Sequence, residues 1–144
     1  MNITVRKCMI SDAPRIRELS RHLLGFEYPQ EKFEANIRKL MTRPSNLILV
    51  AENNGEMVGF AHACDFDILY GPHLKVLRAI AVDEKYRGYG AGKKLLAAVE
   101  DWAKRTGASG MRIYSGSERA SAISLYKRCG YDFVKPETKY KKDF

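Results

Sequence analysis

The sequence predicts a single α/β domain over residues 1–144, with a mixed, mostly antiparallel central sheet flanked by helices. Two observations predict this fold class. Strand-like and helix-like segments alternate without a linker or a repeat, in the order β-α-α-β-β-β-α-β-α-β-β. One apolar strand also runs into a glycine-rich turn that opens a long amphipathic helix. A length of 144 residues suits one domain, and a composition that is 45% hydrophobic and 29% charged is that of an ordinary globular protein.

The N-terminal part is predicted to hold one strand and two helices. Residues 3–6 form the first strand. Ser11 or Asp12 is expected to cap the following helix, which has Pro14 in its first turn. After a break at Gly25, a second helix runs from about residue 30 to residue 41. Apolar residues recur in the two helices at intervals of three and four, at Ile16, Leu19 and Leu23 and at Phe33, Ile37 and Leu40.

The middle of the chain is predicted to form three strands. Residues 47–52 and 57–64 are joined by Asn-Asn-Gly at 53–55, a sequence typical of a hairpin turn, so these two strands pair antiparallel. A further strand, from about residue 75 to residue 82, leads into the glycine-rich run.

The last third is predicted to contain, in order, a helix at 94–106 that Gly107 ends, a strand at 111–114, a helix at 120–129 and two strands at 131–134 and 138–144. Thr138, Tyr140 and Phe144 share one face of the last strand, although Lys142 interrupts it. Such a terminal pair of strands is compatible with a homodimer that pairs or exchanges them.

The run Arg-Gly-Tyr-Gly-Ala-Gly-Lys, from Arg87 to Lys93, carries the main functional signal. The first amides of a helix have no intrahelical acceptor, the helix dipole favours anions there, and glycines let a phosphate approach closely. Lys94 stands where a Walker loop has Ser or Thr, and the glycine spacing G-x-G-x-G is not the dinucleotide fingerprint. The run therefore predicts a site for a different phosphorylated ligand, with a plain tight turn before a helix as the alternative.

The formal net charge of +8 points to an anionic partner. The charge gathers in two clusters, which are Lys85, Arg87, Lys93 and Lys94 around the glycine run and Lys135, Lys139, Lys141 and Lys142 in the tail. The first cluster suits a highly phosphorylated ligand, and the second suits a solvated strand face. The sequence contains neither an aromatic RNA-binding pair nor a zinc module, so nucleic acid is not the expected partner.

Other features narrow the class of protein. No apolar run approaches the ~20 residues of a membrane span, so no membrane partner is expected. Cys8, Cys64 and Cys129 are odd in number and form no Cys-x-x-Cys pair, which indicates reduced thiols in a cytoplasmic protein. The three histidines, including His62, are isolated, so no metal site is expected and each is interpreted as a packing or surface residue.

Two motifs and the order of elements together resemble the GCN5-related N-acetyltransferase (GNAT) family over essentially the whole chain. The glycine run matches its pyrophosphate-binding motif Arg-x-x-Gly-x-Gly, with Arg87, Gly90 and Gly92. The segment from Ala122 to Tyr131 resembles the family's A-x-x-x-Y-x-x-x-G-[FY], with Tyr126 as the tyrosine. The chain departs from the family at Arg119, where many members carry asparagine.

The resemblance implies acetyl-CoA as the acyl donor. It implies that the backbone of residues 80–82 binds the pantetheine arm, that the amides of 88–93 hold the pyrophosphate, and that Ser117 or Arg119 replaces the missing asparagine. It also implies that a strand amide stabilises the oxyanion and that Tyr126 protonates the leaving thiolate as a general acid. The acetyl-CoA-binding residues expected on this basis are Ile80, Ala81, Val82, Arg87, Gly88, Tyr89, Gly90, Ala91, Gly92, Lys93, Ser117 and Tyr126.

The amine acceptor is expected in a cleft bordered by the loop between the first two helices. Glu27 and Tyr28 in that loop, and Asp65 or Asp67 in the loop that follows the strand at 57–64, are candidates for binding the amine or accepting its proton. The alternative for each is an ordinary loop residue.

Arg78 is a further candidate, because it stands in a row of apolar residues of one parity, formed by Leu74, Val76, Ile80 and Val82. A charge in an apolar row costs free energy unless it is paired. Either a bulge moves Arg78 to the other face, or Arg78 points into the acceptor cleft and pairs with a substrate carboxylate, Asp65 or Asp67.

The expected function is that of an acetyl-CoA-dependent N-acetyltransferase, in which a primary amine attacks the thioester directly. The acceptor is expected to be a small molecule such as a polyamine, an amino acid or an aminoglycoside, while a protein amine stays open. The alternative function is a non-catalytic acyl-CoA-binding module of the same fold.

Overall fold

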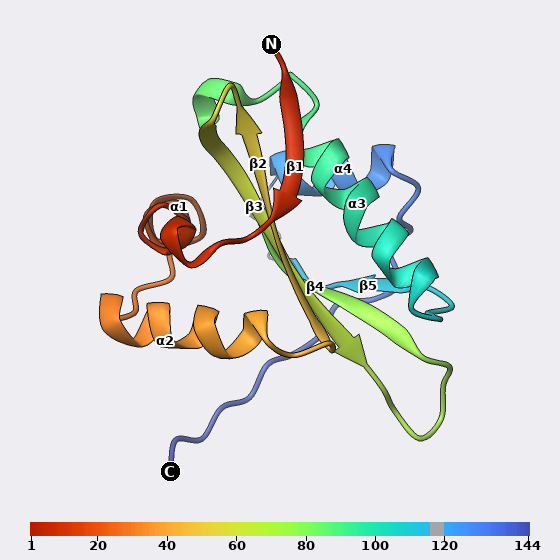
Figure 1. Ribbon diagram of the computed structural model, residues 1–144. Coiled ribbons are helices and arrows are strands. Elements are labelled where there is room, and N and C mark those ends of the chain that lie inside the picture. The colour runs from red at the N-terminus through yellow and green to blue at the C-terminus, as the bar shows by residue number, and fades with distance from the viewer. Residues whose placement is uncertain (116–119) are drawn as a thin grey trace. The chain divides into compact units, whose positions relative to one another are not determined.

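The computed structural model describes residues 1–115 and 120–144. The chain forms two compact units, residues 1–114 and 115–144, which are described separately. The first unit contains, in order, β1 (Ile3–Lys7), η1 (Ile10–Asp12), α1 (Ala13–Leu24), α2 (Gln30–Met41), β2 (Asn46–Asn53), β3 (Glu56–Phe66), β4 (Leu74–Val82), η2 (Glu84–Tyr86), α3 (Ala91–Arg105) and β5 (Met111–Ile113) (Figure 1). The second unit contains α4 (Ala120–Arg128).

The first unit is a five-stranded mixed sheet covered by helices on both faces. The strands lie in the order β1-β2-β3-β4-β5, and each neighbouring pair is antiparallel except β4 and β5, which are parallel. Helices α1 and α2 lie on one side of the sheet and α3 on the other (Figure 1). The predicted fold class is therefore confirmed.

Apolar spacing in the helices gives the sheet a core on each face. Ile16, Leu19 and Ile37 of α1 and α2 pack in one cluster with Val50 and Phe60 of the sheet. On α3 the apolar residues recur at intervals of three and four, and Leu95, Leu96, Val99 and Trp102 are buried. Helix α3 begins at Ala91, three residues before the predicted start, so the last glycine of the run already lies inside the helix.

The predicted pair of strands at 131–134 and 138–144 is wrong. In the second unit, the described residues after α4 form no strand. Four large apolar side chains of these two segments, those of Phe133, Val134, Tyr140 and Phe144, are exposed, so they bury no face of a sheet. Alternation alone therefore did not make a strand in this part of the chain.

Asp12 ties the first strand to the start of α1. Its two carboxylate oxygens each accept a hydrogen bond of 2.8 Å from the Arg6 guanidinium, and one also accepts the Met9 backbone N–H at 2.8 Å. Asp12 stands at the N-cap of α1, but its side chain makes no hydrogen bond to the first amides of that helix. The Asp12 carboxylate therefore stabilises the preceding turn η1 and does not cap α1, because its oxygens accept hydrogen bonds from Arg6 and Met9.

We expect Asp12→Asn to reduce the free energy of unfolding by about 2 kcal/mol at pH 7, since a buried charge-assisted hydrogen-bond pair is lost. Burial raises the pKa of Asp12, but hydrogen bonds from Arg6 and Met9 and the charge of Arg6 outweigh it and hold the pKa below its usual value. A lowered folded-state pKa stabilises the protein above the unfolded-state pKa of ~3.9, and this stabilisation is lost as pH falls through the folded-state pKa.

Urea unfolding at pH 7 and at pH 3 measures this effect. The difference between the wild type and Asp12→Asn should shrink at the lower pH. Asp101→Asn is the matched control, because its carboxylate pairs with Arg105 while 68% exposed and should change stability by less than about 0.5 kcal/mol. A pH-independent difference for Asp12→Asn would contradict the assignment.

Candidate acyl-donor and acceptor sites

The glycine run forms a turn whose backbone leads straight into α3. Gly88 and Gly90 have φ values of +85° and +87°, in the left-handed region that favours glycine. The Lys94 N–H donates to the Gly90 carbonyl at 2.9 Å, which is the first bond of the helix. The amides of Ala91, Gly92 and Lys93 therefore precede the helical ladder and lie at the positive end of a 15-residue helix.

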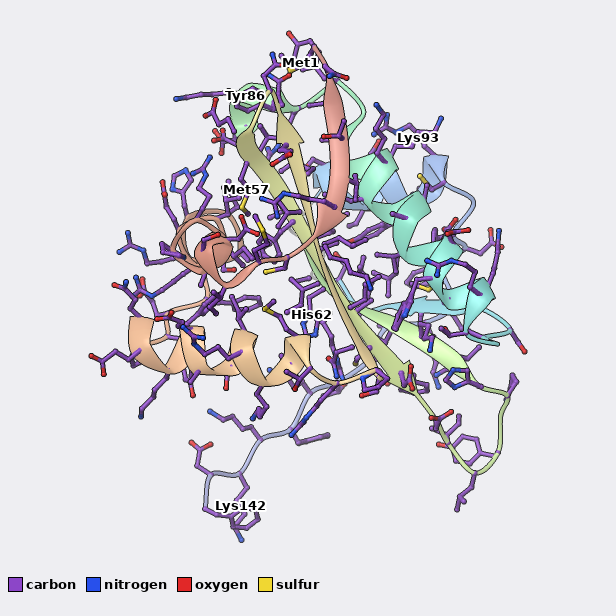
Figure 2. All side chains as sticks on the ribbon, viewed as in Figure 1. Met1, Met57, His62, Tyr86, Lys93 and Lys142 are labelled. Carbon is purple, nitrogen blue, oxygen red and sulfur yellow. The ribbon has the colours of Figure 1, made fainter. Side chains whose placement is uncertain are left out.

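The basic residues around this turn do not act alike. Arg87 and Lys93 are exposed, and the Arg87 side chain donates to the Val82 carbonyl at 3.3 Å. Lys93 lies at the N-terminal end of α3 (Figure 2). Lys94 instead donates from Nζ to the Ile3 carbonyl of β1 at 2.9 Å. Arg87 and Lys93 are thus available beside the turn, while Lys94 fastens α3 to the first strand.

Beside the turn, one edge of β4 is open within the first unit. Strand β5 pairs with β4 only at Lys75–Leu77, whereas β3 pairs with β4 as far as Val82. Within residues 1–114, no strand pairs with the β5-facing edge of residues 78–82. The predicted residues Ile80, Ala81 and Val82 lie on this edge, immediately before the turn.

An ion pair from α1 fixes the end of β4. The Asp83 carboxylate accepts the Lys85 N–H at 3.0 Å and the Arg15 guanidinium at 2.6 Å, and the Asp83 N–H donates to the Val58 carbonyl at 2.8 Å. The Lys85 amide, with Arg15, lowers the pKa of Asp83. This ion pair carries no sequence signal, because Arg15 and Asp83 are 68 residues apart and belong to no motif.

Gly59 lets β3 approach β4 closely at the same place. A Cβ atom at Gly59 would lie 2.7 Å from the Ala81 carbonyl oxygen, closer than real side chains come. Ala81 is one of the residues expected to line the donor site. A glycine inside a strand signals such a close approach, and this signal was available in the sequence.

Arg78 is the extra residue of a β-bulge. In the pairing of β3 with β4, His62 lies opposite Ala79 and Ala63 lies opposite Leu77, so Arg78 has no opposite residue. After the bulge, Ala79 and Ala81 pack with the core under α1 and α2, and the parity of Ile80 and Val82 changes. The bulge suggested from the sequence is therefore present, but its expected effect, a move of Arg78 to the other face of the sheet, is not observed.

The bulge does not take Arg78 away from the cavity beneath α1 and α2. A cavity of about 260 Å³ lies between these helices and the sheet, and Arg78, Ala79 and His62 all line it. Its other walls are mainly apolar, with Ile16, Phe26, Phe33, Ile37, Leu40 and Phe60. Among the described residues, no carboxylate forms an ion pair with Arg78.

The imidazole of His62, which lines this cavity, is neutral. Its Nε2 lies 2.8 Å from Oδ1 of Asn46, and because that oxygen can only accept, Nε2 carries the proton. Burial, with the nearby charge of Arg78, lowers the pKa of His62 to about 4. Figure 2 shows His62 on the side of the sheet that α1 and α2 cover. In the sequence His62 looks isolated, because its partner Asn46 belongs to no histidine motif.

The other acceptor candidates lie elsewhere. Glu27 and Tyr28 are exposed in the connection between α1 and α2 and do not line the cavity, although their neighbour Phe26 does. Asp65 forms an ion pair with Lys75, whose ammonium lies over the ring of Trp102 in α3. Asp65 therefore serves the opposite face of the sheet, so the suggested pair between Arg78 and Asp65 is not formed.

Asp67 also has a different partner. Its carboxylate pairs with His73 at 2.6 Å. The suggested pair between Arg78 and Asp67 is therefore not formed either.

Tyr126 lies in the second unit. Its ring meets that of Tyr131 edge to face, with centroids 6.3 Å apart, and its carbonyl accepts the Tyr131 N–H at 3.0 Å. The helix α4 and the turn after it thus hold the two tyrosines together. Ser117 and Arg119, both considered as donor-site residues, lie outside the described residues.

Three further findings concern membrane spans, metal sites and the Cys8 thiol. No helix in the described part of the chain has the length and apolar character needed to cross a membrane. Among residues 1–115 and 120–144, no three His, Cys, Asp or Glu side chains are grouped as a metal site would need. Burial raises the pKa of the Cys8 thiol to about 11, so that thiol stays protonated and unreactive at neutral pH.

Comparison with known proteins identifies relatives over most of the chain. Residues 13–131 match the model of the acetyltransferase (GNAT) family. An uncharacterized N-acetyltransferase of Bacillus subtilis is 30% identical over 135 residues, which cover 90% of each chain. An IAA acetyltransferase of Azospirillum brasilense is 32% identical over 134 residues, covering 90% of this chain and 84% of its own.

Solved structures show the same fold. An aminoglycoside N-acetyltransferase in complex with CoA superposes with a TM-score of 0.87, covers 98% of this chain and 95% of its own, and is 21% identical. At that identity the likeness concerns the fold alone.

Proposed function

The chain belongs to the GNAT family of acetyltransferases, and from this premise we propose that residues 1–144 act as one domain that acetylates a primary amine with acetyl-CoA. The amine nitrogen attacks the thioester carbonyl carbon, the C–N bond forms and the C–S bond breaks. The amine loses one proton and the leaving thiolate gains one, so the products are an acetamide and the free thiol of CoA. The solved relative that holds CoA supports this donor.

The observation that carries the proposal is the position of the glycine turn between an open strand edge and the start of α3. The amides of Ala91, Gly92 and Lys93 supply hydrogen-bond donors at the positive end of the helix, and a pyrophosphate fits such a site. Added Cβ atoms at Gly88 and Gly90 would meet nothing within 4 Å, so space is open beside the turn. Arg87 and Lys93 add charge of the right sign.

The open edge of β4 would hold the pantetheine arm. The backbone groups of residues 80–82 that face away from β3 have no strand partner within the first unit, and an amide-bearing chain can pair with them as a further strand would. One amide of this segment would then donate to the developing oxyanion. The Arg15–Asp83 clamp would hold the edge and the turn in fixed register.

We expect Gly90→Ala to raise the KM for acetyl-CoA by about tenfold. Alanine at a φ of +87° costs about 1–2 kcal/mol, and relief of that strain would move the amides of Ala91–Lys93. Gly107→Ala is the matched control, because Gly107 has a φ of +88° at the other end of α3. It should lower the Tm to a similar extent with an unchanged KM. Equal effects of the two variants on KM would contradict a donor site at Gly90.

The function itself is tested by the release of free thiol from acetyl-CoA across a panel of amines, with the acetylated product identified by mass. Turnover of at least one primary amine is expected. Binding of acetyl-CoA without turnover of any amine would instead support a non-catalytic acyl-CoA-binding module.

A further inference from the structure

We propose that the amine acceptor is a small molecule with one amino group, an apolar body and a carboxylate, as in a hydrophobic amino acid. The apolar body would occupy the cavity beneath α1 and α2, and the carboxylate would pair with Arg78. This inference rests on the proposed acetyl transfer and names the class of its acceptor.

The size and walls of the cavity set the first limit. Its volume of about 260 Å³ is below the ~300–1,000 Å³ of sites for drug-sized ligands. Aromatic and branched side chains from α1, α2 and the connection between them, including Ile16, Phe33 and Phe26, face apolar residues of the sheet across it. Such walls favour a compact apolar group, because burying apolar area is favourable and burying an unpaired charge is costly.

The charges of the cavity set the second limit. Among the described residues that line the cavity, Arg78 carries a positive charge and no residue carries a carboxylate. His62 adds no positive charge at pH 7, since its pKa is about 4. A polyamine or an aminoglycoside carries several ammonium groups, and this lining would offer them a like charge and no counter-ion. A monoamine with an acidic group is the complementary ligand.

The bulge explains why Arg78 is available to bind the carboxylate of the acceptor. An arginine in a regular strand row would have to be buried with its neighbours, whereas the bulge leaves Arg78 exposed at the cavity and without an opposite residue on β3. No described carboxylate neutralises it. A guanidinium in this state can bind a carboxylate through two parallel hydrogen bonds. His62 is next to it, and its Nδ1 is an acceptor because Nε2 donates to Asn46.

The test compares kcat/KM for matched amines with free thiol release as the readout. L-Phenylalanine is compared with phenethylamine, which has the same body without the carboxylate, and with spermidine and kanamycin as polycations. We expect phenylalanine to be preferred over phenethylamine and over both polycations by at least about tenfold. In the series alanine, 2-aminobutyrate and norvaline, kcat/KM should rise roughly fourfold per methylene.

The variants Arg78→Ala, Arg78→Lys and Arg21→Ala locate the effect. Arg78→Ala should lower kcat/KM for phenylalanine by about 30-fold, mainly through KM, and change that for phenethylamine less than about twofold. Arg78→Lys should restore part of the loss, because the charge returns without the fork of donors. Arg21→Ala removes an exposed charge from α1 that does not line the cavity and should have no effect.

Three outcomes overturn the inference: an equal loss for phenylalanine and phenethylamine in Arg78→Ala, a preference for a polycation, or no dependence on apolar length. In each of these cases amines are still acetylated, so the proposed function stands. If no amine is turned over, the proposed function fails, and calorimetry of phenylalanine binding in the presence of CoA decides the inference. Binding to the wild type and not to Arg78→Ala would support the inference, and absence of binding to both would overturn it.

Discussion

Tyr126→Phe is expected to lower kcat for amine acetylation by about 10²- to 10³-fold, the usual effect of losing a general acid, because we propose that Tyr126 protonates the leaving thiolate, as the family resemblance implies. The substitution removes one hydroxyl and keeps the ring that meets Tyr131 edge to face in the second unit. Without a proton donor, the leaving group must depart as a free thiolate or take its proton from water. The Kd for acetyl-CoA should stay within a factor of about three, because the ring keeps its volume.

Tyr131→Phe is the matched control for this experiment. It removes the hydroxyl of the neighbouring tyrosine, at a position where the resembled motif accepts phenylalanine as well as tyrosine. We expect kcat and the Tm to change little. Steady-state kinetics of both variants, with binding of acetyl-CoA measured separately, separates chemistry from binding. If Tyr126→Phe and Tyr131→Phe have similar small effects, protonation of the thiolate is assigned to solvent and not to Tyr126.

The sequence predicted the elements that repeat a pattern. The apolar spacing of α1, α2 and α3 and the Asn-Asn-Gly turn between β2 and β3 are local signals, and the structure has an element at each place. The glycine run could also be predicted, because positive φ values at Gly88 and Gly90 demand glycine. These features depend on residues close together in the chain.

Features that depend on distant partners could not be predicted in the same way. The bulge at Arg78 changes the parity of β4, so Ile80 and Val82 face the opposite side from the one that simple alternation assigns. The neutral state of His62 depends on burial beneath α1 and α2, and the clamp on β4 depends on Arg15. The prediction of terminal strands was wrong for a related reason. Alternation at 138–144 indicates which residues share a face, but it does not supply a partner strand.

Lys75 is a charged residue that is buried in the core beneath α3. The sequence predicted only that it lies in a strand. Its side chain is 2% exposed, its ammonium lies 4.3 Å from the centre of the Trp102 ring, and it forms an ion pair with Asp65 on the neighbouring strand. Asp65 lies directly opposite Lys75 in the antiparallel register. The pair thus joins β3 and β4 beneath α3, on the face of the sheet opposite Arg78.

Asp65→Ala is expected to reduce the free energy of unfolding by about 3–5 kcal/mol, since it leaves a buried ammonium without its counter-ion. The ring of Trp102 still faces that charge but cannot accept its three N–H donors as a carboxylate and water do. Lys75→Met should cost less, because the Asp65 side chain is 31% exposed and can be hydrated. The double variant Asp65→Ala/Lys75→Met should be close to the wild type, because no charge remains buried.

Urea unfolding of the four proteins gives the coupling free energy of the pair, and acetylation by the double variant tests the location of Asp65. Because Asp65 serves the face beneath α3, the folded double variant should keep the acceptor KM of the wild type. An additive cycle, in which the two single losses sum to the double loss, would show that the ion pair contributes nothing. A stable double variant with a raised acceptor KM would contradict this location and would show that Asp65 contributes to the acceptor site.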